Sequence, residues 1–81
     1  MEHDKNIISL IELEDGQCGT IISLNGSRNL TKRLADLGIS PGTIITVLRG
    51  SLFSGPVQVE VSGSKLVLGR GLATKILVEL K

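Results

Sequence analysis

The sequence predicts a mainly β fold: a small antiparallel barrel of five or six short strands with one short α-helix near residues 29–37. Hydrophobic residues make up 41% of the 81 residues and Phe53 is the only aromatic, so the core must consist of Ile, Leu and Val, which favour strands. Apolar and polar residues alternate with a period of two, most clearly in the segment 57–61. Turn-forming Gly, Pro, Asn and Ser residues separate the short apolar segments.

A chain of this length predicts one domain, which we place at residues 7–81 after a flexible N-terminal lead of residues 1–6. A short strand is expected at 8–10 and a second strand from Gln17 to Leu24, after a turn at Glu14–Gly16. In the second strand the apolar residues do not alternate regularly and Gly19 interrupts them, which predicts a bent strand with a β-bulge. Asn25-Gly26 is a strong turn dipeptide.

The stretch 29–42 predicts a short helix that leads through a fixed corner into the next strand. Its leucines are spaced four and three residues apart, so they lie on one helix face and are expected to be buried: Leu30, Leu34 and Leu37. Asn29 is the expected N-cap, and Gly38 is expected to end the helix with positive φ. Ile39 would then fold back as the apolar residue of a Schellman cap, and Ser40-Pro41-Gly42 would form a turn.

The second half predicts strands at 43–49, 57–61 and 76–80, with a hairpin turn at 62–64 and a return strand through Leu66 and Leu68. Strand 43–49 has apolar residues on both faces, so one face is expected to meet the core and the other a neighbour or partner. A loop is expected at 50–55, a corner at Gly69–Gly71, and one helical turn at 72–75.

The charge and targeting features point to a soluble protein of the cytoplasm. Nine basic and eight acidic residues give a net charge of +1, which argues against a nucleic-acid binder. Cys18 is the only cysteine, so no internal disulfide can form and a reducing compartment is favoured. The apolar run 7–11 is too short for a signal peptide or a membrane span, so no direct membrane insertion is expected.

No residue pattern predicts catalysis, so we expect the protein not to be an enzyme and to need no cofactor. The only histidine, His3, and the only cysteine, Cys18, are not placed as a nucleophile and base, and there is no phosphate-binding loop. Glu14 and Asp15 flank a turn, which favours a role in that turn over acid–base chemistry.

Metal binding is also not predicted, although potential ligands gather near the N-terminus. Ferrous iron accepts imidazole and carboxylate ligands. None of these side chains stands at a spacing that fixes a coordination geometry, and solvated charges on a tail and a turn explain them better. The residues concerned are His3, Asp4, Glu12, Glu14, Asp15 and Cys18.

The chain resembles the FeoA family, the small accessory proteins of bacterial ferrous-iron transport. Residues 33–42, Arg-Leu-Ala-Asp-Leu-Gly-Ile-Ser-Pro-Gly, resemble the family signature RLxDLGxxPG, and residues 13–21 resemble its opening L-x-x-G-Q-x-G-x-I. Residues 55–61, 63–70 and 73–79 resemble its second half in the same order. The resemblance implies an SH3-like barrel and a non-enzymatic role in which the protein docks on the cytoplasmic GTPase region of the transporter FeoB.

A regulatory role is the alternative. Similar SH3-like domains form the C-terminal part of iron regulators related to the diphtheria toxin repressor, and those carry a DNA-binding helix-turn-helix upstream. This chain is too short to hold such a unit beside the SH3-like domain. Self-association of the chain is a further interaction to be considered.

The expected partner-binding residues are Leu52, Phe53, Arg33 and Arg70. Leu52 and Phe53 are adjacent large apolar residues in a loop, and both cannot face the core if that loop is extended. Phe53 could instead fold under and plug the barrel end. Arg33 belongs to a basic cluster with Arg28 and Lys32, in which Lys32 could pair with Asp36; this cluster fits a solvated helix face as well as a partner contact.

Overall fold

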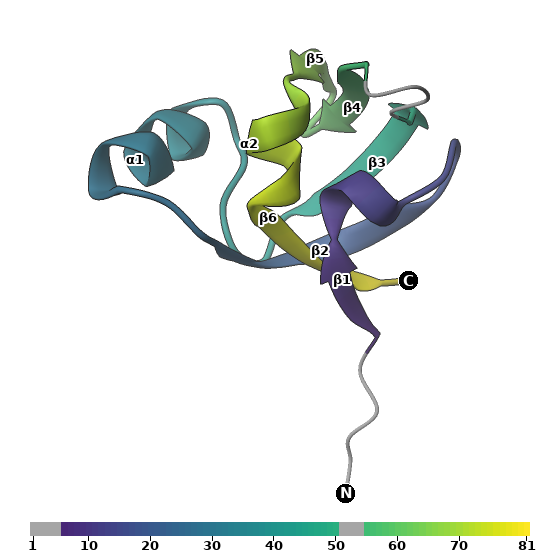
Figure 1. The fold of residues 1–81 in the computed structure, drawn as a ribbon, viewed down its shortest axis with the longest axis horizontal. Helices are drawn as coiled ribbons and strands as arrows, with labels where there is room; N and C mark the ends of the chain where they lie inside the picture. The colour runs from purple at the N-terminus through teal and green to yellow at the C-terminus, as the bar shows by residue number, and fades with distance from the viewer. Residues whose placement is uncertain (1–5, 51–54) are drawn as a thin grey trace, which may run out of the picture.

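A computed structural model describes residues 6–50 and 55–81, and it consists of one six-stranded antiparallel sheet with helical segments packed on it (Figure 1). The expected lead at residues 1–5 and the loop residues Leu52 and Phe53 lie outside the described residues. The elements in chain order are β1 Ile7–Ser9, the 3-10 helix η1 Leu10–Glu12, β2 Cys18–Leu24, α1 Arg28–Asp36, β3 Ile44–Arg49, β4 Val57–Val61, β5 Ser64–Leu68, α2 Arg70–Thr74 and β6 Ile76–Leu80.

The strand order β1-β6-β2-β3-β4-β5 confirms the expected antiparallel architecture. The C-terminal strand β6 lies between the two N-terminal strands β1 and β2. The edge strands β1 and β5 do not pair with each other, so the barrel is not closed. Strands β4 and β5 are joined by Ser62 and Gly63, both with positive φ (51° and 82°), which is the backbone of a type I′ hairpin turn.

The β-bulge predicted in the second strand is present. The pairing of β2 with β6 shifts between Ile21 and Ser23, which leaves Ile22 as the extra residue. Gly19 lies where a Cβ atom would approach the carbonyl oxygen of Glu79 to 2.8 Å, so the close pairing of β2 and β6 requires glycine there.

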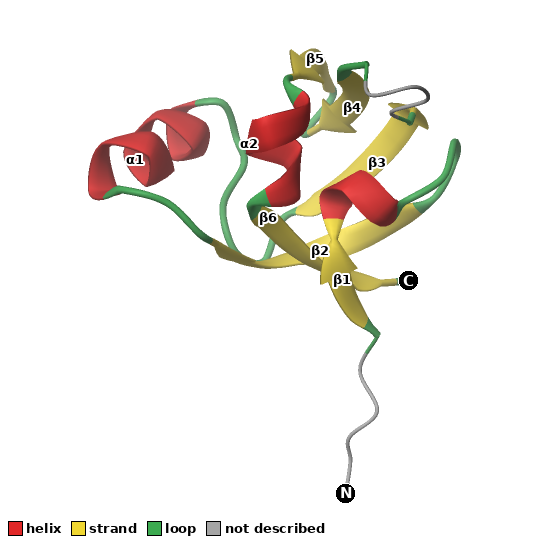
Figure 2. Cartoon of the chain, viewed as in Figure 1, coloured by secondary structure: helices red, strands yellow, loops and turns green. Residues whose placement is uncertain are grey.

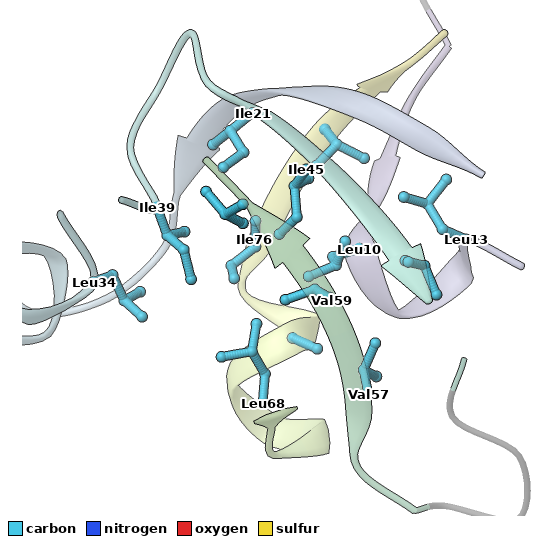
Figure 3. Packing of buried hydrophobic residues seen from close by; sticks show 14 residues of the cluster. Leu10, Leu13, Ile21, Leu34, Ile39, Ile45, Val57, Val59, Leu68 and Ile76 are labelled. Atoms are coloured by element: carbon cyan, nitrogen blue, oxygen red, sulfur yellow. The ribbon is translucent and has the colours of Figure 1, made fainter. Parts of the chain in front are cut away.

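The core consists of aliphatic side chains from the inner faces of the strands (Figure 3). The predicted alternation in β4 is confirmed, because Val57, Val59 and Val61 are buried. The other buried core residues come from other strands, from the helical segments and from the connections between them: Leu10, Leu13, Ile21, Leu34, Ile39, Ile45, Val47, Leu68, Ala73, Ile76 and Val78.

Two short helical segments differ from the expectation. The first strand ends at Ser9, one residue before the expected end, because Ser9 caps η1 through its side chain. The Ser9 hydroxyl also donates to the carbonyl of Thr74 at 2.9 Å, which satisfies a carbonyl at the end of α2. The expected corner at Gly69–Gly71 is wrong: Gly69 is the N-cap of α2, and Arg70 and Gly71 already lie within that helix.

Candidate partner interface

Helix α1 begins at Arg28, two residues before the start that capping by Asn29 would give, because Ser27 is its N-cap. The Ser27 hydroxyl accepts a hydrogen bond from the Leu30 backbone N–H at 3.2 Å, and Ser27 has extended backbone angles. Both residue types cap helices well. Capping by Ser27 includes Arg28 and Asn29 in the first turn, so Arg28 becomes the first helical residue.

The C-terminal end of α1 is the predicted Schellman cap. Gly38 has φ of +92°, and its N–H donates to the carbonyl of Ala35 at 2.9 Å. The N–H of Ile39 donates to the carbonyl of Leu34, also at 2.9 Å, which is the second bond of this motif. Leu34 and Ile39 are both buried and lie next to each other at one side of the core in Figure 3.

The corner after α1 is anchored to the sheet. Ser40 accepts from the N–H of Thr43 at 3.1 Å, and with Pro41 and a positive φ at Gly42 (+94°) this forms a type II turn. The Gly42 N–H donates to the carbonyl of Ile21 at 2.7 Å, and the Ile21 N–H donates to the carbonyl of Thr43 at 2.8 Å. Residues 38–43 therefore fix the position from which α1 extends.

The expected burial of Leu37 is wrong, whereas that of Leu34 is confirmed. Leu34 is 3% exposed, but Leu37 is 48% exposed. Helix α1 ends at Asp36, and after the Schellman cap it is Ile39 that is buried in the core. Leu30 is half-buried against the core, so α1 is anchored through Leu34 and Leu30, which lie about one turn apart.

The outward side of α1 is polar and basic. Arg28, Lys32 and Arg33 are exposed, and Arg28 and Lys32 lie four residues apart on adjacent turns. The possible Lys32–Asp36 ion pair does not form. Within the described residues, no ion pair involves Arg28, Lys32, Arg33 or Asp36. Figure 2 shows α1 at the margin of the molecule, apart from the strands, so this side faces solvent.

Two further basic residues lie on α2. Arg70 is its first residue and Lys75 its C-cap, and both are exposed. The Asn25 N–H donates to the carbonyl of Lys75 at 2.8 Å, which joins the end of α2 to the loop that enters α1. The cations of α1 lie together on one element, and we call them the helical basic surface: Arg28, Lys32 and Arg33.

Of the predicted partner-binding residues, the structure places Arg33 on α1 and Arg70 on α2, and both are exposed. Leu52 and Phe53 lie outside the described residues, so their role stays a prediction.

The outer face of β3 agrees with the expected two-sided strand. Ile45 and Val47 are buried, whereas Ile44 and Leu48 are exposed on the opposite face. The bulge residue Ile22 of β2 is also exposed. Strands β2 and β3 thus carry exposed apolar side chains.

The side chains of Asp15 and Gln17 form structural hydrogen bonds near the N-terminal turn. Asp15 accepts a hydrogen bond from the Gly50 N–H at 2.5 Å, and Gln17 accepts one from the Glu14 N–H at 2.8 Å. Cys18 is half-buried and opposite Thr46 in the sheet. Within residues 6–50 and 55–81, no three His, Cys, Asp or Glu side chains are grouped so that they could hold a metal ion.

None of the helices in the described part of the chain is long and apolar enough to cross a membrane.

Comparison with known proteins identifies the family. The model of the FeoA domain family matches residues 8–80. A protein of Methanocaldococcus jannaschii, named provisionally as an Fe(2+) transport protein A, is 33% identical over 66 residues, which cover 82% of this chain and 78% of that protein.

Solved structures agree with this assignment. The crystal structure of an iron uptake regulatory protein, FeoA, superposes with a TM-score of 0.86 at 29% identity and covers 93% of this chain and 99% of that one. A manganese-dependent transcriptional repressor superposes with a TM-score of 0.85 at 24% identity, but the match covers 98% of this chain and only 44% of the repressor. With a family match across almost its entire length and the signature segment built into the α1 corner, the chain belongs to the FeoA domain family.

Proposed function

We propose that this protein is a non-enzymatic cytoplasmic accessory of ferrous-iron uptake that docks on the cytoplasmic GTPase region of a FeoB-type membrane transporter. Membership of the FeoA family supports the link to iron transport.

The docking role is supported by the signature segment, in which some residues build the corner and another stays exposed. Leu34, Gly38, Ile39 and the Pro41-Gly42 turn build and anchor the corner, whereas Arg33 remains exposed on α1. The segment thus holds a polar helix away from the sheet in a fixed position. A fixed exposed helix is suited to recognition of another protein.

The test is to measure direct binding between the purified full chain and the purified cytoplasmic GTPase region of the transporter by isothermal titration calorimetry. We expect a saturable one-to-one interaction. If no binding is detected with each protein at about 100 μM, a concentration at which even weak transient complexes form, the proposal is contradicted. GTP hydrolysis by the transporter region, measured with and without this protein, would then show whether docking changes catalysis.

A regulatory module is the second candidate, favoured by the similar fold of the manganese-dependent repressor, of which this chain matches less than half. An electrophoretic mobility shift with DNA separates the two. DNA binding at physiological salt without binding to the transporter region would favour the regulatory candidate. We expect the opposite result, because the net charge is only +1.

A further inference from the structure

Charge is unevenly distributed over the structure. The two helices with the α2 cap carry five basic residues and one acidic residue, Asp36, which gives a net charge of +4. The remainder of the described residues carries three basic residues, Arg49, Lys65 and Lys81, and five acidic residues, which gives −2. The positive charge of the described residues is therefore concentrated on the two helices, and three of these cations lie on α1 alone.

The basic residues of α1 are arranged unfavourably for the helix itself. Arg28 is the first helical residue, where the helix dipole is positive and disfavours a cation, and the first turn contains no acidic residue. Arg28 and Lys32 are like charges four residues apart on one face, which also destabilises a helix. None of the five cations is neutralised by an ion pair with a described residue. This arrangement is not explained by the stability of the fold.

We propose that the helical basic surface is a recognition site for an acidic surface on a partner protein. This inference rests on the proposed function in that it names the chemistry of the docking surface. Two of the three cations are arginines, whose planar guanidinium groups bind carboxylates through two parallel hydrogen bonds. Because these cations are exposed and form no ion pair with another described residue, a partner's carboxylates replace water at them without breaking such pairs.

Two other anionic partners fit the surface less well. A membrane-surface helix inserts an apolar face into the lipid, but the apolar face of α1 is turned to the core through Leu34 and Leu30. Nucleic acid would meet the negative remainder of the molecule, and the sequence pI of about 7.9 is below that of typical nucleic-acid binders. An acidic protein surface of limited size matches a positive side of limited size.

The test uses charge reversal on the full chain with a matched control. The α1 variant combines Arg28→Glu with Lys32→Glu. The control combines Arg49→Glu with Lys81→Glu, which changes the net charge by the same amount at exposed positions outside the two helices. Binding is measured to the transporter's cytoplasmic region, to poly-L-glutamate, and to vesicles containing phosphatidylglycerol. Folding is checked from urea midpoints followed by circular dichroism.

We expect the α1 variant to bind the transporter region and poly-L-glutamate about tenfold more weakly, and the control to change binding by less than about threefold. The single variant Arg28→Glu should weaken binding while its urea midpoint stays equal or rises, because it places an acid at the positive helix end and opposite Lys32. A merely structural role of Arg28 would not separate stability from binding in this way.

Three outcomes overturn the inference: equal losses in the α1 variant and the control, no loss in either, or tighter binding to vesicles than to both proteinaceous probes. Failure of the proposed function is separate. If the wild type binds poly-L-glutamate through α1 but not the transporter region, the acidic-surface inference holds and the transporter is not the partner.

Discussion

The anchoring of α1 depends on Leu34 and not on Leu37, and a pair of alanine substitutions tests this. Leu34 is 3% exposed and lies at the side of the core beside Ile39 (Figure 3). Replacing a buried leucine with alanine costs about 2–5 kcal/mol, and a position at the edge of a core can partly relax, so we expect about 2–3 kcal/mol for Leu34→Ala.

Leu37 serves as the control, because it has the same chemistry and is three residues away but is 48% exposed. Full burial of a leucine contributes about 1.5–3 kcal/mol, so about half of this burial, without an enclosed cavity, gives a loss of about 1 kcal/mol or less for Leu37→Ala. An 81-residue domain has a total stability of roughly 4–12 kcal/mol. Leu34→Ala therefore removes a large fraction of it.

The assay is urea unfolding followed by far-ultraviolet circular dichroism, since the chain has no Trp or Tyr for fluorescence. A loss of about 2–3 kcal/mol corresponds to a fall in melting temperature of roughly 8–20 °C for a domain of this size. Equal losses for the two variants, or a larger loss for Leu37→Ala, would refute the assignment of Leu34 as the anchor.

Three further predictions concern the ends of α1, the glycines and metal binding. Ser27→Ala should destabilise the protein by about 0.5–2 kcal/mol in urea unfolding, whereas Asn29→Ala should have almost no effect, since only Ser27 caps the helix. Gly38→Ala should cost about 1–2 kcal/mol because of its φ of +92°, whereas Gly71→Ala, with free space around the added methyl in α2, should stabilise by about 0.5–1 kcal/mol; melting curves with the same sign for both would contradict this. Anaerobic titration with ferrous iron should show no stoichiometric site with micromolar affinity, and Cys18→Ser should leave the titration unchanged.

Local patterns predicted most of the fold. The alternation in 57–61, the irregularity in β2 and the glycine after the α1 leucines each reflect a local constraint on the backbone, and each appears in the structure. Leu37 was mispredicted because helical periodicity does not show where the helix ends relative to the core. The N-cap was mispredicted as Asn29, because Ser and Asn are both residue types that cap helices well and the cap is Ser27.

The candidate interface was less predictable than the fold. The sequence shows the basic cluster on α1, but not that the Asn25–Lys75 hydrogen bond joins the end of α2 to the loop before α1. It also could not show that Lys32 and Asp36 do not pair with each other, because four-residue spacing permits an ion pair without enforcing it.

The position of β6 in the sheet has a consequence for how the chain folds during synthesis. Residues 76–80 fill the gap between β1 and β2, and β6 supplies the buried side chains of Ile76 and Val78. Until these residues have been made, β1 has no strand to pair with and one side of β2 is open. An incomplete nascent chain thus exposes two unpaired strand edges, which are prone to intermolecular pairing. Completion of the sheet must follow translation of β6, because β1 and the open side of β2 pair only with that strand.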